Sequence, residues 1–220
     1  KNPLAGIIGA AQLLENSNVK NKKMLIQIVL EEAKRIESIV DRVQLLGEVN
    51  RLDFAVLNIH DVIDKVKRAA SQGYGSHVLF EENYDPSIPS VHGDFELLTQ
   101  AFHNLIKNAC EAVSKKSGRV NIKTCFYSGL ALGSFGEKNK KLQLMITIAD
   151  NGPGVSKNII ADIFDPFSTS KIGGSGLGLP LVAKIVSEHG GFVELDEMCE
   201  GACFNIYLPA YSSAHYERGK

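Results

Sequence analysis

The chain has 220 residues and a formal net charge of −1, a length that suits one large domain or two small ones. The balanced charge and the lack of a long basic run argue against nucleic acid as a partner. Apolar residues make up 44% of the sequence, yet no apolar run approaches the roughly eighteen residues of a membrane span, and no signal peptide is visible. We therefore expect a cytoplasmic protein with no membrane span in this part of its sequence.

The cysteines favour a reducing environment over a disulfide framework. Cys199 and Cys203 are four positions apart and resemble half of a metal site, but no second pair of Cys or His stands at ligand spacing. We expect four reduced cysteines, namely Cys110, Cys125, Cys199 and Cys203.

The first fifty residues predict two helices. Apolar residues recur every three or four positions from Leu4 to Leu14 and again from Leu25 to Leu46, which is the spacing of amphipathic helices. The segment ENSNVKN interrupts this pattern with turn-forming residues. Two such helices form an antiparallel hairpin that cannot close a core alone, so we expect residues 1–52 to dimerise into a four-helix bundle.

Beyond Leu52 the pattern indicates strands mixed with helices. Helical spacing covers Phe95 to Ser114 and roughly Leu179 to His189, and a shorter helix follows a strand in VLNIHDVIDKVKRAA. The remaining expected strands are HVLFEENYD, RVNIKTCFY, LQLMITIAD, GFVELDEM and ACFNIYLPA. This mixture predicts an α/β sandwich over residues 53–211, an α+β class for the whole chain, and a tail at 212–220.

The helix from Phe95 carries a row of polar residues. Asn104 and Asn108 are four positions apart and share a helix face, and Glu111 follows nearly in line. One interpretation is a strip that faces solvent. The other is a row of oxygens aimed at Mg²⁺ and phosphate, since hard cations take oxygen ligands.

A glycine-containing turn follows the strand LQLMITIAD. Asp150 stands at the strand end, and Gly152 and Gly154 follow it. A simple tight turn explains these residues. A carboxylate beside glycines can also accept a hydrogen bond from an amino group while the bare backbone lets a flat ring lie against it. The next segment, IFDPFSTSK, places Phe164 and Phe167 beside a Ser/Thr cluster, which suits a mobile lid.

The stretch GGSGLGLPLV, from Gly173 to Val182, suggests a phosphate site. Glycines let the backbone take left-handed angles and bring peptide N–H groups near an anion, and the following helix adds its N-terminal donors. The stretch does not end in the Gly-Lys-Ser/Thr of a Walker A loop, and no strand stands directly before it as in a Rossmann loop. Protein-kinase signatures are also missing.

The order of these segments is more specific than any one of them. The Asn-rich helix, the Asp-x-Gly-x-Gly turn, the Phe-containing lid and the Gly-x-Gly-x-Gly loop resemble the N, G1, F and G2 boxes of sensor histidine kinases, over about Asp94 to Pro209. The opening KNPL resembles the end of the family motif His-Glu-x-x-Asn-Pro-Leu. The phosphoacceptor histidine is then expected just before Lys1, in a longer protein. Together with YDPSIPSVHGD and DNGPGV, the chain is most similar to the nitrogen-regulation sensor kinases.

The resemblance implies a GHKL-type ATP-binding domain that uses ATP and Mg²⁺. It implies that Asp150 accepts from the adenine amino group, that Asn108 with Asn104 behind it holds Mg²⁺, and that Asn2 orients water for dephosphorylation. The catalytic residues so implied are Asn2, Asn104 and Asn108. The nucleotide-binding residues so implied are Asn104, Asn108, Glu111, Asp150, Gly152, Gly154, Phe167, Thr169, Gly174, Gly176, Leu177 and Gly178.

The resemblance also implies partners: a second copy of the chain, an NtrC-like response regulator whose aspartate receives the phosphoryl group, and a PII-type signal protein. Two other classes remain open, a GHKL-fold ATPase or serine kinase without a histidine acceptor, and a non-catalytic interaction module, against which the intact glycine boxes argue. His103 is expected to be structural or to contact a site residue rather than the ligand. The histidines expected at the surface or in caps are His60, His77, His92, His189 and His215.

Overall fold

The protein divides into two compact units, Lys1–Asn50 and Arg51–Lys220. The structure, a computed structural model, describes residues 3–15, 19–46, 52–127, 143–169 and 175–211. Asn2, Gly174 and the tail expected at 212–220 lie outside these ranges. None of the helices within them combines the length and the apolar composition that crossing a bilayer requires.

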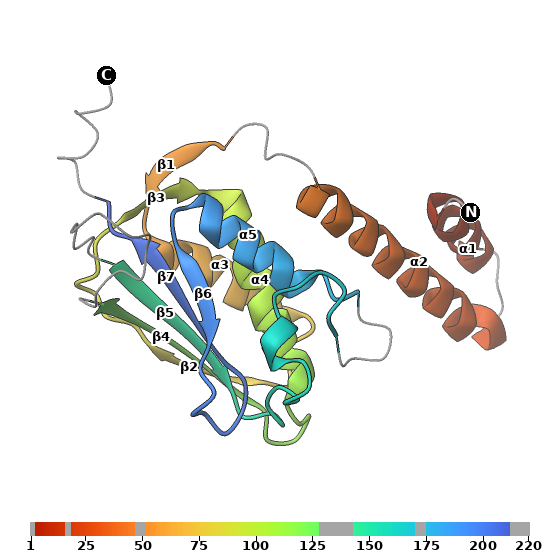
Figure 1. The fold of residues 1–220 in the computed structure, drawn as a ribbon. Coiled ribbons are helices and arrows are strands. Elements are labelled where there is room, and N and C mark those ends of the chain that lie inside the picture. Colours follow the sequence, from red (N-terminus) through yellow and green to blue (C-terminus); the bar gives the residue numbers. More distant parts are fainter. Residues whose placement is uncertain (1–2, 16–18, 47–51, 128–142, 170–174, 212–220) are drawn as a thin grey trace. The chain divides into compact units, whose positions relative to one another are not determined.

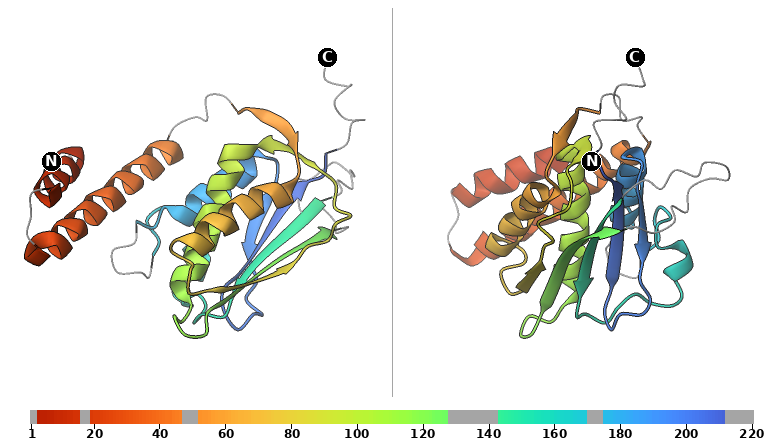
Figure 2. Two further views of the ribbon diagram at one scale, coloured as in Figure 1. Left: turned by 180° about the vertical axis from the view of Figure 1, so that it is seen from behind. Right: turned by 90° about the vertical axis from the view of Figure 1, so that its left-hand side faces the viewer.

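The first unit is a helical hairpin, as the spacing of its apolar residues predicts. Helices α1 (Pro3–Glu15) and α2 (Val19–Leu46) pack against one another, and only three residues separate them, so they run antiparallel (Figure 2). Ala10 and Leu25 are buried. A larger set of apolar side chains stays exposed on this unit: Leu4, Ile8, Leu13, Met24, Ile26, Leu30, Ile39 and Val40.

The second unit is built on a five-stranded sheet, which confirms the predicted α/β sandwich. The strand order is β2-β4-β5-β7-β6, and only the β2–β4 pair is parallel. The strands are β2 (Leu79–Asn83), β4 (Arg119–Tyr127), β5 (Gln143–Asp150), β6 (Phe192–Leu195) and β7 (Cys203–Pro209).

Three helices cover one face of this sheet (Figure 1): α3 (Ile59–Gln72), α4 (Phe95–Ala112) and α5 (Gly178–Glu188). Alternate residues of the central strands face them, and Ile122, Ile146 and Ile148 are at most 1% exposed. A separate antiparallel pair joins β1 (Phe54–Leu57) to β3 (Val91–Asp94), and a short 3-10 turn, η1, spans Ile160–Asp162. The sheet and the helices therefore share one apolar core.

Helix α4 begins where its sequence provides a cap. Asp94 Oδ1 accepts hydrogen bonds from the backbone N–H groups of Glu96 and Leu97, at 3.0 Å each. These donors have no partner within the helix, so a carboxylate at this position stabilises the first turn both as an acceptor and as a negative charge. The cap sets the start of the helix that carries the polar row.

His189 is buried, so the expectation that it lies at the surface is wrong, whereas a capping position is confirmed. It caps α5, its side chain is 5% exposed, and Nδ1 donates to Ile185 O at 2.7 Å. Nε2 accepts from the backbone N–H of Asp94 at 2.9 Å. A Cβ on Gly93 would lie only 2.7 Å from His189 Cδ2. The ring thus ties the end of α5 to the end of β3.

We expect the unfolding free energy to decrease in mild acid. Burial lowers the pKa of His189 below 6.5, and it also lowers the pKa of His60. The unfolded chain then binds more protons than the folded one, so stability is full above the unfolded-state pKa near 6.5 and falls as the pH drops below it. Urea unfolding from about pH 7.5 to about pH 5.5 measures this loss.

His189→Asn is the variant that isolates the ring. It removes the acceptor of Asp94 N–H and should cost about 1–3 kcal/mol at neutral pH. It should also flatten the acid dependence, leaving the part that His60 supplies. An unchanged slope in this variant would show that His189 is not the titrating group.

Candidate functional site

The polar row of α4 faces the beginning of α5. Asn104 and Asn108 are half-buried. A Cβ on Gly178, the first residue of α5, would lie 3.5 Å from Asn104 Oδ1 and 3.9 Å from Asn108 Nδ2. The first N–H groups of a helix have no acceptor inside it and carry partial positive charge. The structure therefore brings the predicted amides and the predicted phosphate-binding backbone together.

Asp150 is held rigidly at the end of β5. Its Oδ1 accepts from Gly152 N at 2.8 Å and from Ala202 N at 3.4 Å. The backbone N–H of Asp150 donates to Ala202 O at 2.9 Å. A Cβ on Gly201 would overlap the Asp150 carbonyl oxygen, so only glycine allows this approach. Gly201 and Ala202 are not among the residues predicted from the sequence, although a glycine just before a strand is a signal of close backbone approach.

The turn after Asp150 rests on the C-terminal end of α4. A Cβ on Gly152 would lie 3.0 Å from Ala112 O. Burial raises the pKa of Cys110 to about 11, and the negative charges of Glu111 and Asp150 add to that rise. Both carboxylates therefore lie near the same thiol. Asn104 and Ala112 are eight positions apart, which is about 12 Å along the helix, so the two groups of predicted residues stand at separate points along α4.

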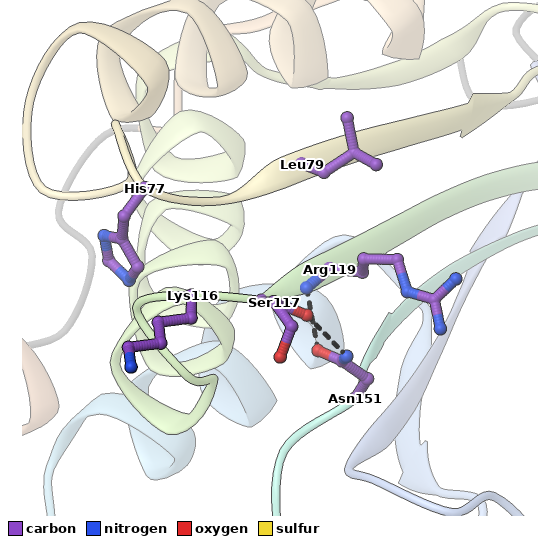
Figure 3. A pocket seen from close by; sticks show the side chains of 7 residues that line it. His77, Leu79, Lys116, Ser117, Arg119 and Asn151 are labelled. Atoms are coloured by element: carbon purple, nitrogen blue, oxygen red, sulfur yellow. Dashed lines mark hydrogen bonds between the residues drawn. The ribbon is translucent and has the colours of Figure 1, made fainter.

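Asn151 anchors the turn from its other side. Its Oδ1 accepts from Arg119 N at 2.7 Å and its Nδ2 donates to Ser117 O at 2.9 Å, as Figure 3 shows. Both bonds go to the backbone around the start of β4. Asn151 is not among the residues predicted from the sequence, and Asn in a tight turn was the available signal.

Asn151 also borders a cavity of about 450 Å³ at the sheet edge (Figure 3). None of the residues predicted to bind nucleotide lines it, so this cavity is separate from the row on α4. Its lining residues are His77, Leu79, Lys116, Ser117, Gly118, Arg119 and Asn151.

The predicted lid is joined to the glycine loop by its backbone. Phe167 N donates to Gly176 O at 2.8 Å. Gly176 has φ +65°, and a Cβ there would lie 2.5 Å from the carbonyl carbon of Phe167. Leu177, next in the chain, is 1% exposed. Glycine at 176 is thus required by the neighbouring backbone, whatever ligand the loop binds.

The two lid phenylalanines are placed differently. Phe164 is half-buried and meets Phe204 edge-on, with the ring centroids 6.4 Å apart. Phe167 is 62% exposed and has φ 71°, a conformation that L-residues seldom adopt. Thr169 is exposed. One ring therefore anchors this segment, and the other faces solvent.

The arrangement has a clear chemical capacity. Amide oxygens beside a helix N-terminus can hold a hard cation and an anion together. A fixed carboxylate between glycines can accept from an amino group on a flat ring. Asn104, Asn108 and Gly178 form the first group, and Glu111, Asp150 and Gly152 lie at the second. Gly154, with φ +75°, belongs to the same turn and faces Gly201.

Two family profiles match the chain, one over most of the second unit and one over the first. Residues 93–212 match the histidine kinase-, DNA gyrase B- and HSP90-like ATPase family. Residues 1–51 match the His Kinase A (phospho-acceptor) domain. The first match contains every described residue of the polar row, the Asp150 turn and the glycine loop.

The chain is similar over almost its whole length to two sensory histidine kinase/phosphatases. The sensory histidine kinase/phosphatase NtrB of Rhizobium leguminosarum bv. phaseoli is 41% identical over 219 residues, which are 99% of this chain and 57% of that protein. NtrB of Rhizobium meliloti (strain 1021) is 43% identical over 212 residues, or 96% and 56%. The chain thus spans little more than half the length of these relatives.

A solved structure has the same fold. The histidine kinase ThkA in complex with the response regulator protein TrrA aligns with a TM-score of 0.67 at 23% identity, over 96% of this chain and 58% of that one. The first family profile matches more than half of the chain, and its residues form the site described above. The chain belongs to the family of histidine kinase-, DNA gyrase B- and HSP90-like ATPases.

Proposed function

We propose that this chain is the catalytic part of a sensor histidine kinase of a two-component system, which uses ATP to phosphorylate a histidine just upstream of Lys1. The observation that carries the proposal is the position of Gly178 beside Asn104 and Asn108, with the Asp150 turn at the end of the same helix. The match of residues 1–51 to a phospho-acceptor domain supports a histidine acceptor over an ATPase or serine kinase that lacks one.

The adenine end of the nucleotide is proposed at Asp150. Its carboxylate accepts from the adenine amino group while Gly152 and Gly154 leave room for the ring. The bonds from Gly152 N and Ala202 N support this role, because they fix the carboxylate before the ligand arrives. Glu111, Phe167 and Thr169 are proposed to border the nucleotide, and the phosphate end is proposed to be lined by Gly174, Gly176, Leu177 and Gly178.

The metal is proposed to be Mg²⁺ held by Asn108, with Asn104 behind it. Side-chain amide oxygens are suitable ligands for a hard cation, and the N-terminus of α5 beside them suits the phosphates that such a cation accompanies. Bound there, Mg²⁺ supplies neutralisation of phosphate charge. The residues of the chain hold the phosphates and the cation in the correct geometry, and such positioning is most of what phosphoryl transfer requires.

The reaction is proposed as two in-line transfers. A ring nitrogen of the upstream histidine attacks the γ-phosphorus of ATP, the bond to the bridging oxygen breaks, and ADP leaves. A carboxylate oxygen of a response-regulator aspartate then attacks that phosphorus and the P–N bond breaks. In a separate phosphatase reaction, Asn2 is proposed to orient a water that attacks the phosphorus of the aspartyl phosphate. The bond from phosphorus to the aspartate oxygen then breaks, and inorganic phosphate leaves.

The partners are proposed from the relatives and from the surface of the first unit. An NtrC-like response regulator, a PII-type signal protein and a part in nitrogen regulation are proposed from the resemblance to the nitrogen-regulation sensor kinases. Two relatives that carry the name NtrB fit this proposal. The exposed apolar residues of α1 and α2 support a homodimer, because two hairpins together could bury them.

Asp150→Asn should weaken binding of ATP and of adenosine alike. The amide can still accept from Gly152 N, but it presents an NH₂ group where the adenine amino group needs an acceptor. The expected loss is about 1–3 kcal/mol. Calorimetry with a non-hydrolysable ATP analogue measures it, and Asp61→Asn, an exposed carboxylate on α3, is the control. Equal affinity for the Asp150 variant and the wild type would remove Asp150 from the site.

Asn108→Ala should lower phosphorylation about 100-fold, because the cation and the phosphates lose their position. The measurement uses a chain extended upstream of Lys1 through the expected histidine, labelled ATP and Mg²⁺. The wild type should gain acid-labile label. Asn121→Ala, on the opposite face of the sheet, should label normally. Label on a chain whose upstream histidine is replaced by Gln would contradict the proposed acceptor.

The protein should sediment as a dimer through its first unit. Leu30 is 56% exposed and lies one turn from Ile26, which is also exposed. Leu30→Glu should shift the protein to the monomer, since it would bury a charge in the interface. Gln27→Glu adds the same charge at a polar position of α2 and should stay dimeric. A Leu30→Glu variant that remains dimeric would place the interface elsewhere.

A further inference from the structure

The connection from β6 to β7 gathers two thiols and a carboxylate. Asp196, Cys199 and Cys203 each offer one ligand atom, and these three atoms lie within 4.8 Å of one another. In the sequence the two cysteines have no second pair of Cys or His at ligand spacing. The missing donor is Asp196, three positions before Cys199, which the hairpin turns back toward the start of β7.

Backbone bonds hold this cluster in shape. The N–H of Asp196 donates to Cys203 O at 2.8 Å, which closes the loop at its base. Asp196 Oδ1 accepts from Met198 N at 3.0 Å, so the carboxylate is oriented and its second oxygen can still coordinate a cation. Cys203 is 3% exposed, whereas Cys199 is exposed. Asp196 and Cys203 are therefore held in place by the fold, whereas the side chain of Cys199 is exposed to solvent.

The surrounding charge favours a cation. The loop carries Asp196, Glu197 and Glu200, and no Lys or Arg occurs from Ile185 to Tyr211. Negative groups are thus crowded together here, and a bound metal ion would offset them.

We propose that Asp196, Cys199 and Cys203 form a binding site for one Zn²⁺ ion, with the fourth position open to water. Two thiolates select a borderline-soft ion over Mg²⁺ or Ca²⁺, and three protein ligands with one open position is an arrangement that Zn²⁺ adopts. Zn–S bonds of about 2.3 Å place the two sulfurs roughly 3.8 Å apart in a tetrahedron. The ligand atoms already lie within 4.8 Å of one another, so the two sulfurs have to approach by at most about 1 Å. The exposed side chain of Cys199 allows such a movement.

The position of this site gives it a second consequence. Gly201 and Ala202 lie between the two cysteines in the chain, and Ala202 N donates to Asp150 Oδ1 at 3.4 Å. A bound ion would restrain the segment that orients Asp150. This link to the nucleotide rests on the proposed function, whereas metal binding itself does not depend on it.

Titration of the reduced chain with Co²⁺ tests the site directly, because Co²⁺ replaces Zn²⁺ and reports thiolate ligands by absorption. One equivalent should produce a thiolate-to-cobalt charge-transfer band and tetrahedral visible bands. Zn²⁺ should displace the ion and Mg²⁺ should not. Cys199→Ser and Asp196→Asn should each weaken binding about tenfold or more. Both positions lie outside the sheet, and circular dichroism checks that the variants fold.

Cys125→Ser is the matched control. Cys125 on β4 pairs with Met145 on β5, which in turn pairs with Tyr207 on β7. Tyr207 is four positions along β7 from Cys203, so Cys125 lies away from the proposed site. This variant should bind Co²⁺ as the wild type does. A wild type without a thiolate band, or equal affinity in either ligand variant, would overturn the site. A wild type that shows the cobalt spectrum but does not bind the ATP analogue would contradict the proposed function alone.

Discussion

Helix α4 has to bury one face in the core and present the adjacent face to the site, and most of the second unit follows from that constraint. Leu98, Phe102 and Leu105 are at most 1% exposed, so their burial against the sheet sets the rotation of the helix about its axis. Asn104 and Asn108 then emerge beside the first residue of α5. Asp94 caps the helix, and its backbone N–H donates to His189 Nε2. These two interactions set where the helix begins relative to α5 and β3.

The need of each buried backbone group for a hydrogen-bond partner explains which residues surround Asp150. A strand end has to find partners for its backbone groups, and here Asn151 and Ala202 provide them. Gly152 and Gly201 are needed because any side chain would collide with Ala112 or with Asp150 itself. A carboxylate held in this way loses little conformational freedom when it accepts a further hydrogen bond, which is the physical basis for its proposed role.

The polar row on α4 and the loop between β6 and β7 differ in the ligands that they offer. The row on α4 offers amide oxygens, which suit hard cations, and the loop before β7 offers thiols with one carboxylate, which suit a softer one. The loop reaches Asp150, which accepts from Ala202 N and lies beside the C-terminal end of α4, about 12 Å along the helix from Asn104. The hairpin loop therefore does more than reverse the chain, because its backbone orients a residue of the candidate site.

The sequence by itself determined most of the elements and their order, but it predicted a loop where strand β3 (Val91–Asp94) forms. Apolar periodicity predicted the hairpin of α1 and α2, the start of α4 at Phe95, and the final strand pair. These features depend on neighbours within a few positions of one another. The clustering of Asn104, Asn108 and Gly178 was also predictable once the glycine and asparagine segments were compared with a known family.

Only the tertiary structure decided which distant residues touch. Nothing local indicated that the His189 ring would accept from Asp94 N–H, that Gly176 would face the backbone of Phe167, or that β1 would leave the main sheet to pair with β3. Asp196 became the third donor beside Cys199 and Cys203 only when the hairpin closed. Each of these contacts depends on how the chain returns through space, and periodicity within one segment carries no information about that path.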